Sequence, residues 1–194
     1  MKRKIILASA SPRRRELLTQ IGLDFTVMPS DVEENPASTL PQDIVIELSK
    51  EKARDVWNRI GQSDCLVISA DTVVAIDGEI LGKPEDEADA ARMLELLSGK
   101  EHQVYTGVTL VWIDEEGKQK EYSFYVCTNV VMYRMSRAQI LTYVQSGEPM
   151  DKAGAYGVQG KAAAFIKAIR GEYSNVVGLP VGRLYQEMKA WELL

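Results

Sequence analysis

A run of twelve residues, CLVISADTVVAI at positions 65–76, constrains the fold more than any other feature of the sequence. It predicts a buried strand, and the dipeptide DG that follows it predicts a tight turn into a second strand. One acidic side chain, Asp71, interrupts this apolar run. Because a carboxylate buried without a partner is strongly destabilising, Asp71 requires a cation, a metal ion or several hydrogen-bond donors. Lys52 and Lys83 are candidate cations, and a purely structural ion pair is the alternative.

Helices and further strands alternate around this run. Apolar periodicity and capping residues predict helices at 12–20, 42–60, 85–98, 136–147 and 178–194. Strands are predicted at 4–10, 25–29, 103–113, 121–133 and 162–169, and loops at 29–40 and 148–160. The short segment DEEGK joins two of the strands into an expected antiparallel hairpin. Together these elements predict an α/β fold with a mixed sheet, in a single domain over residues 1–194.

Charge and residue counts exclude several classes of protein. The formal net charge of −5 argues against a general nucleic-acid or membrane-surface binder. No apolar run approaches the roughly 20 residues that cross a bilayer, and the N-terminal one is too short for a secretory signal. Cys65 and Cys127 fit reduced thiols, and the single histidine, His102, argues against multi-histidine metal sites and a histidine-based triad. We therefore expect a cytoplasmic protein.

Three arginines stand at the start of the first predicted helix, in the stretch LASASPRRRELL. Ser11 is the expected N-cap and Pro12 the first helical residue. Each cation there is unfavourable by about 0.3–1 kcal/mol, because the helix dipole is positive at this end. A bound phosphate would reverse this effect, since free backbone amides and arginine side chains both favour it. We interpret Arg13 and Arg14 as a phosphate site and Arg15 as a solvated surface residue.

Two loops carry further candidate residues. Glu33 and Glu34 lie in the loop 29–40, where carboxylates are usually solvated. A site for polyphosphate generally needs Mg²⁺ or Mn²⁺, and Glu33 with Asp71 is a candidate ligand pair. The glycines of the loop 148–160 are spaced as GxxGxxG, which matches neither the dinucleotide fingerprint nor the P-loop. The polar residues of this loop, among them Gln159, suit contacts to a ligand.

In this order and over nearly the whole chain, seven motifs resemble the Maf family of nucleotide pyrophosphatases: SASPRR, EKA, ADTVV, GKP, YTGV, DKAGAYGVQG and NVVGLP. The resemblance implies hydrolysis of nucleoside triphosphates between the α- and β-phosphates, with a divalent metal, Mg²⁺ or Mn²⁺, as cofactor. It also implies an elongated α/β fold with a cleft between two lobes, similar to the inosine triphosphate pyrophosphatases (the Maf/Ham fold).

The resemblance also implies roles for individual residues. Asp71 matches the proposed general base, which with Glu33 would lie at the metal. The positions that line the phosphate site are Ser9, Arg13, Arg14, Lys52 and Lys83.

The resemblance also implies a base preference. The residues at three positions, Arg13, Thr72 and Gln159, are similar to those of the branch of the family that acts on dTTP and UTP. One alternative is the sister branch acting on 7-methyl-GTP. Another is a nucleotide-binding regulator of septum formation and cell division. Because exposed strand edges often pair, we expect a homodimer. The other expected partner is the nucleotide substrate.

Overall fold

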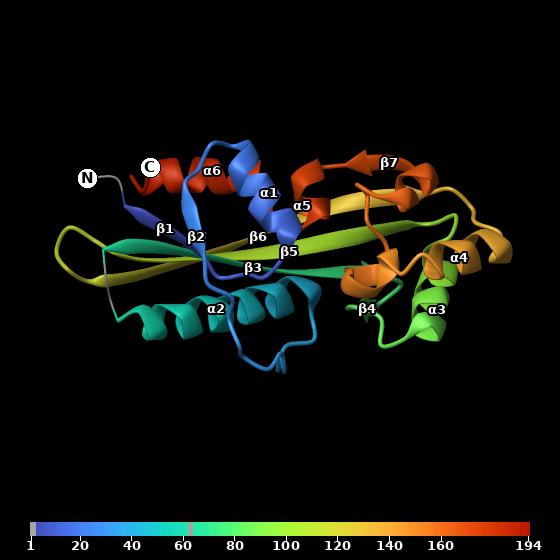
Figure 1. Ribbon diagram of the computed structural model, residues 1–194, viewed down its shortest axis with the longest axis horizontal. Coiled ribbons are helices and arrows are strands. Elements are labelled where there is room, and N and C mark those ends of the chain that lie inside the picture. Colours follow the sequence, from blue (N-terminus) through green and yellow to red (C-terminus); the bar gives the residue numbers. More distant parts are fainter. Residues whose placement is uncertain (1–2, 62–63) are drawn as a thin grey trace. The chain divides into compact units, whose positions relative to one another are not determined.

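A computed structural model describes residues 3–61 and 64–194 (Figure 1). Within these residues one mixed sheet has the strand order β2-β1-β3-β5-β6-β7, and β4 pairs with β3. Its strands are β1 Lys4–Leu7, β2 Phe25–Val27, β3 Cys65–Ile76, β4 Glu79–Leu81, β5 Glu101–Ile113, β6 Gln119–Met132 and β7 Ile166–Arg170. The β1–β2 and β1–β3 pairs are parallel, whereas the β3–β4 and β6–β7 pairs are antiparallel. The predicted α/β class with a mixed sheet is confirmed.

The described residues also form helices between the strands and after the last one. The α-helices are α1 Pro12–Gln20, α2 Pro41–Ile60, α3 Glu87–Leu97, α4 Arg137–Val144, α5 Tyr173–Val177 and α6 Val181–Ala190. The short 3₁₀ helices in the described part of the chain are η1 Glu148–Asp151, η2 Ala153–Ala155 and η3 Lys161–Phe165. None of the helices within the described residues is long and apolar enough to span a membrane.

The chain divides into two compact units. The first comprises Met1–Asp71, Thr106–Val126 and Gly178–Leu194, and the second comprises Thr72–Tyr105 and Cys127–Val177. Strands β3, β5 and β6 contribute residues to both. The single-domain assignment stays a prediction.

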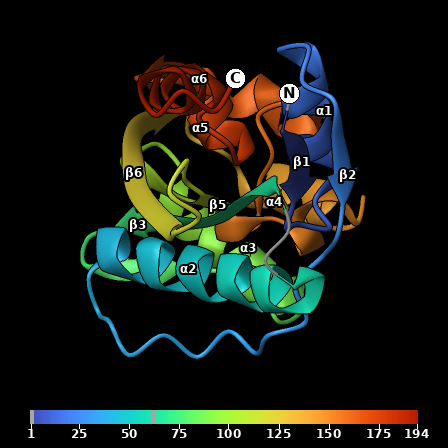
Figure 2. The same ribbon diagram turned by 90° about the vertical axis from the view of Figure 1, so that its left-hand side faces the viewer.

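In the first unit α2 covers one face of the sheet, and α1 and α6 lie on the other (Figure 2). Apolar residues of α2, among them Val56 and Trp57, pack with Ile6, Val67 and Val111 of the strands. The helix approaches β5 so closely that a Cβ at Gly107 would lie 2.3 Å from the carbonyl oxygen of Val45. Only glycine therefore allows this helix and strand to pack at the observed distance.

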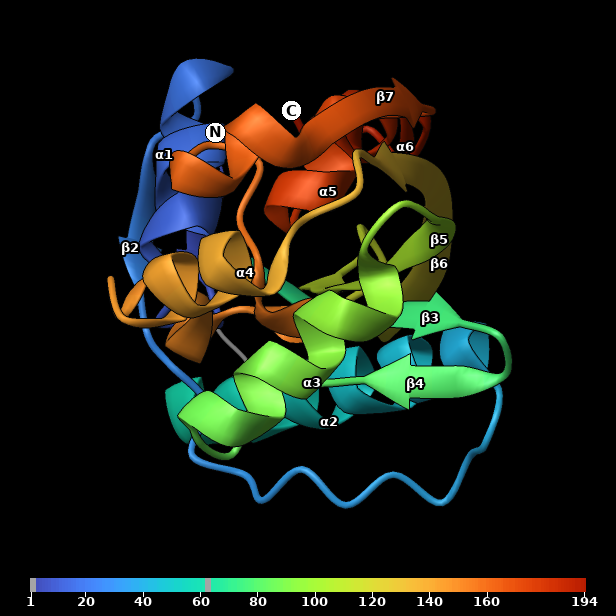
Figure 3. The same cartoon turned by 90° about the vertical axis from the view of Figure 1, so that its right-hand side faces the viewer.

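In the second unit α3 and α4 lie side by side, and β3 turns back into β4 (Figure 3). Asp77 and Gly78 form this turn with φ values of 51° and 83°, as the DG dipeptide predicts. Helix α4 begins with a capping box in which Ser136 and Gln139 exchange hydrogen bonds. Asp86 is the N-cap of helix α3, and its carboxylate accepts a hydrogen bond from the backbone amide of Asp89 at 2.7 Å.

Several boundaries differ from the sequence-based predictions. The strand 65–76 and the helix 12–20 are confirmed to the residue, with Ser11 as N-cap. The predicted strand 162–169 is wrong in its first half, because residues 161–165 form η3 and only Ile166–Arg170 is strand. Helix α6 ends at Ala190 rather than residue 194. The short helix α5 was not predicted.

Candidate active site

Asp71 on β3 forms an ion pair with Lys52 on α2. The distance from Lys52 Nζ to Asp71 Oδ1 is 2.5 Å, and both side chains are largely buried, with 13% and 10% of their surface exposed. A neighbouring contact holds α2 and β3 together at this point: Ser69 on β3 donates a hydrogen bond to the carbonyl of Ser49 on α2. Lys52 lies about one helical turn beyond Ser49, and Asp71 is two residues beyond Ser69 on the same face of its strand. Of the partners expected for Asp71, the structure shows a cation, Lys52, and the catalytic role of Asp71 stays a prediction.

A second carboxylate shares this lysine. Glu34, in the loop before α2, lies 2.7 Å from Lys52 Nζ through its Oε1 and is about half exposed. Glu33, the neighbouring residue proposed from the resemblance as a metal ligand, is exposed and makes no ion pair within residues 3–61 and 64–194. Glu34 is therefore the loop carboxylate that the structure brings to Asp71, and sequence reasoning did not distinguish the two.

Arg14 is anchored by hydrogen bonds of its guanidinium group. Its Nε donates to the carbonyl of Gly178 at 2.8 Å, and its Nη1 donates to Ser9 Oγ at 3.1 Å. Ser9 Oγ also accepts from the backbone of Ser11 at 3.3 Å. Ser9, just after β1, thus accepts hydrogen bonds both from the N-cap residue of α1 and from the Arg14 side chain, which fixes the orientation of Arg14.

The parallel pairing of β1 and β3 explains why these groups gather. Leu7, the last residue of β1, pairs with Ile68 of β3. Because the two strands run in the same direction, Ser9 after β1 and Asp71 further along β3 both lie beyond this pair, toward the same end of the sheet. Ligands of open α/β sheets bind at such carboxyl ends of parallel strands. Phosphate-binding candidates from β1 and α1 therefore lie next to a buried carboxylate.

The pKa of Arg14 responds to burial and to the charged groups near it. Burial lowers the pKa of Arg14, whereas the negative charge of Asp71 raises it, Arg13 lowers it and Glu34 raises it. Arg14 stays charged at neutral pH, since a guanidinium is protonated far above that range. Arg13, Asp71 and Glu34 thus all lie close enough to Arg14 to act on its pKa.

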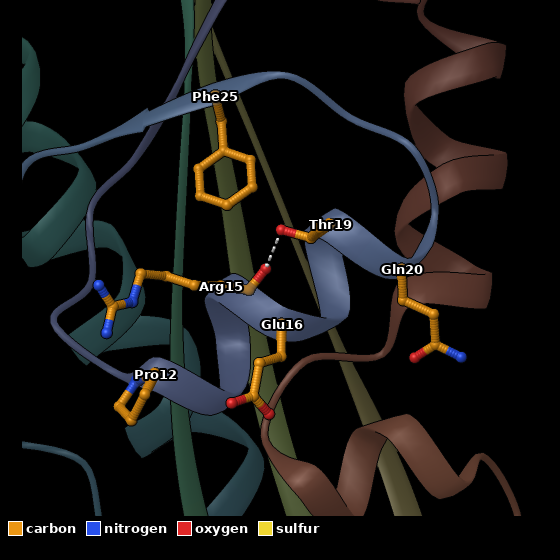
Figure 4. Close-up of a pocket in the computed structure, with 6 residues that line it drawn as sticks. All are labelled: Pro12, Arg15, Glu16, Thr19, Gln20 and Phe25. Carbon is orange, nitrogen blue, oxygen red and sulfur yellow. Dashed lines mark hydrogen bonds between the residues drawn. The ribbon is translucent and has the colours of Figure 1, made fainter.

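Arg15 lies apart from this cluster. Together with five other residues it lines an open groove of about 540 Å³ between α1 and β2 (Figure 4). The lining residues are Pro12, Arg15, Glu16, Thr19, Gln20 and Phe25. The Arg15 side chain is exposed, which agrees with its interpretation as a surface residue.

Three predicted site residues belong to the second unit. Thr72 follows Asp71 on β3 and is half-buried, whereas Lys83 and Gln159 are exposed. Neither Lys83 nor Gln159 makes a hydrogen bond or ion pair with its side chain in the described part of the chain. Their roles stay predictions.

The only histidine is buried in the second unit and takes no part in the cluster. His102 Nε2 lies 2.7 Å from the hydroxyl of Tyr156, and burial lowers the pKa of His102 to about 4. The ring is neutral at physiological pH. Among the described residues there is also no group of three or more histidine, cysteine or acidic residues arranged to hold a metal.

Comparison with known proteins identifies the family. The model of the family described as Maf-like protein matches residues 4–191. The chain belongs to the Maf family. A protein of Agathobacter rectalis named dTTP/UTP pyrophosphatase is 54% identical, and the match covers 96% of each chain. A protein of Lachnoclostridium phytofermentans with the same name is 48% identical over 96% of this chain and 94% of its own.

A solved structure shares the fold of this Maf protein. The HAM1 protein of Coxiella burnetii matches 97% of this chain and 99% of its own, with a TM-score of 0.53 and 16% identity. This likeness confirms the predicted Maf/Ham-like fold.

Proposed function

We propose that this Maf protein hydrolyses nucleoside triphosphates to a monophosphate and diphosphate, with a preference for dTTP and UTP. The names of relatives about half identical over nearly the whole chain support this activity. The observation that carries the proposal is the position of Arg14, which lies beside the buried pair of Asp71 and Lys52. A triphosphate carries enough negative charge to stabilise cations at the start of α1.

Asp71 is the proposed general base. It accepts a proton from a water molecule whose oxygen forms a bond to the α-phosphorus. The bond from the α-phosphorus to the α–β bridging oxygen breaks, and its electron pair leaves with diphosphate. Lys52 orients the Asp71 carboxylate through its hydrogen bond. In phosphoryl transfer, positioning and charge stabilisation supply most of the catalysis.

Arg13, Arg14 and Ser9 are the proposed ligands of the phosphates, with Lys52 and Lys83. Arginine suits this role because its planar guanidinium matches two phosphate oxygens at once. Arg14 is already fixed by Ser9 and Gly178, so little side-chain freedom is lost when a phosphate binds.

The carboxylates of Asp71 and Glu34 fit a divalent cation, Mg²⁺ or Mn²⁺, since both ions prefer oxygen ligands. Both carboxylates already face one positive charge, the ammonium of Lys52. When bound, the cation neutralises phosphate charge. Glu33, the ligand that the resemblance implies, stays a second candidate.

Arg13, Thr72 and Gln159 are the proposed determinants of base preference. The amide of Gln159 can donate to the O4 oxygen and accept from the N3 proton along one edge of uracil or thymine. A glutamate at this position would place a negative charge against O4. This difference favours pyrimidine substrates over 7-methyl-GTP.

A substrate panel tests the proposal. Diphosphate release is measured with Mg²⁺ and with Mn²⁺ for dTTP, UTP, CTP, ATP, GTP and 7-methyl-GTP. We expect the highest kcat/KM for dTTP and UTP and no release after chelation with EDTA. Tight binding of dTTP without turnover with either metal would instead favour a nucleotide-binding regulator. A preference for 7-methyl-GTP would contradict the assigned specificity.

A further inference from the structure

The proposed specificity residue lies in a tight turn of the second unit. The amide of Gly160 donates to the carbonyl of Gly157 at 3.2 Å, so Val158 and Gln159 occupy the two central positions of a β-turn. Val158 is buried and Gln159 is exposed. The direction of the Gln159 amide therefore depends on how the two ends of this turn are held.

Two side chains hold the turn, one at each end. The hydroxyl of Tyr143 on α4 accepts a hydrogen bond from the Gly157 amide at 3.3 Å. The Oε2 atom of Glu148 on η1 accepts one from the Lys161 amide at 3.0 Å. The two side chains also meet, since Tyr143 donates to Glu148 Oε1 at 3.0 Å. A continuous chain of hydrogen bonds thus runs from one end of the turn to the other.

Close packing reinforces these hydrogen bonds. A Cβ at Gly160 would lie 2.1 Å from Glu148 Oε1, and a Cβ at Gly157 would lie 2.6 Å from Lys152 Cε. Lys152 in turn donates to the carbonyl of Glu148 at 2.6 Å. Both glycines therefore allow the turn to rest directly on the side chains that hold it.

The Tyr143 hydroxyl remains a proton donor throughout the neutral range. Burial raises the pKa of Tyr143, and the hydrogen bond to the Glu148 carboxylate raises it further. The ring is almost fully buried, so a phenylalanine would occupy the same space. The hydroxyl can therefore be removed without emptying the core.

We propose that Tyr143 and Glu148 are positioning residues for Gln159 and set the base preference of the enzyme through the turn at 157–160. The inference rests on the proposed function, in which Gln159 reads the pyrimidine edge. Neither residue needs to touch the nucleotide. A positioning error of about 1 Å costs up to roughly 100-fold in rate, so a loosened turn is expected to weaken discrimination.

The test compares Tyr143→Phe with a matched control, Tyr133→Phe, which removes a hydroxyl from an exposed tyrosine of the same unit. Two quantities are measured. The first is hydrogen exchange at the Gly157 and Lys161 amides in the free protein. The second is the ratio of kcat/KM for UTP to that for CTP, with and without Gln159→Ala.

We expect Tyr143→Phe to accelerate exchange at both amides by about five- to tenfold, the effect of one lost hydrogen bond, and to lower the UTP-to-CTP ratio. In the Gln159→Ala background the ratio should not change further, because residues that act as a unit are not additive. Glu148→Gln should act in the same direction. The control should change neither quantity.

Unchanged exchange in Tyr143→Phe would overturn the proposal, whatever the activity. It would also be overturned if exchange accelerated while the ratio stayed constant, or if the ratio fell equally without Gln159. Failure of the wild-type enzyme to hydrolyse either nucleotide would contradict the proposed function instead. In that case the exchange measurement still decides whether Tyr143 holds the turn.

Discussion

The ammonium of Lys52 lies 2.5 Å from the carboxylate of Asp71, and both side chains are almost removed from water. Such a pair is held in place by its surroundings more than by its own attraction, because two ions must be desolvated to form it. Here α2 and β3 are joined by apolar packing and by the hydrogen bond from Ser69 to Ser49. The fold thus places a fixed carboxylate and a fixed cation beside Arg14.

Lys52→Met should destabilise the protein, because it leaves Asp71 buried without its ion pair. The expected loss is about 3 kcal/mol in the free energy of unfolding, measured with urea. Asp71→Asn in the same chain should restore part of this loss by removing the buried charge. As a control, Arg170→Met breaks the exposed pair with Glu101 and should cost less than about 1 kcal/mol. If Lys52→Met and Arg170→Met lost the same free energy of unfolding, burial of the Lys52–Asp71 pair would not explain its importance.

Arg14→Lys should impair catalysis although the charge is kept. A lysine cannot donate to Ser9 and Gly178 at once and still present a planar fork to phosphate. We expect kcat/KM for dTTP to fall by about 10- to 100-fold, the value of a charged hydrogen bond. Arg15→Lys, on the neighbouring groove, should change it less than about twofold. If the two variants lost the same activity, the assignment of distinct roles would be wrong.

The strand from Cys65 to Ile76 and the helix after Ser11 could be predicted from sequence, because a long apolar run and a capping residue act locally. The start of strand β7 could not be predicted, because the alanines of the AAAF segment (residues 162–165) are compatible with both helix and strand. The conformation of this segment depends on a contact distant in sequence, in which the Tyr133 amide donates a hydrogen bond to the Phe165 carbonyl at 2.8 Å.

The candidate site shows the same division. The need of Asp71 for a cation follows from its buried context, and its partner was among the two lysines considered. The choice of Glu34 over Glu33 depends on how an irregular loop passes α2, for which sequence holds no periodic signal. Tyr143 and Glu148 were missed because each is ordinary in its own segment and gains a role only through the turn that it contacts.

Gly107→Ala should lower stability without changing the charge of the site. The added methyl would overlap the carbonyl of Val45, so α2 and β5 must separate. We expect a loss of about 1–3 kcal/mol in the free energy of unfolding. Gly82→Ala is the control, since a Cβ there meets nothing within 4 Å. A larger loss at Gly82 than at Gly107 would rule out this explanation.

Stability should decrease as the pH falls below about 6.5, because His102 is neutral in the folded protein. Its pKa is lowered by burial from 6.5 to about 4, so between these values the unfolded chain binds a proton that the folded protein does not. The contribution is complete above pH 6.5 and is lost as the pH falls toward 4. Between pH 7 and pH 5 the loss is about 2 kcal/mol.

Urea unfolding of the wild type and of His102→Gln at the two pH values measures this contribution. The variant should lose about 2 kcal/mol less than the wild type over this interval, because it lacks the titrating ring. Identical pH dependence in both proteins would show that His102 is not held neutral by the fold.

The central claim is that Asp71 is the general base for a nucleotide bound beside Arg14, and the most direct measurement is diphosphate release from dTTP by Asp71→Asn, with bound dTTP measured in parallel. The control, Asp77→Asn, changes an exposed aspartate in a turn that also accepts asparagine. The account predicts that Asp71→Asn still binds dTTP within a few-fold of the wild type but releases at least about 1000-fold less diphosphate. Wild-type release by Asp71→Asn would contradict it.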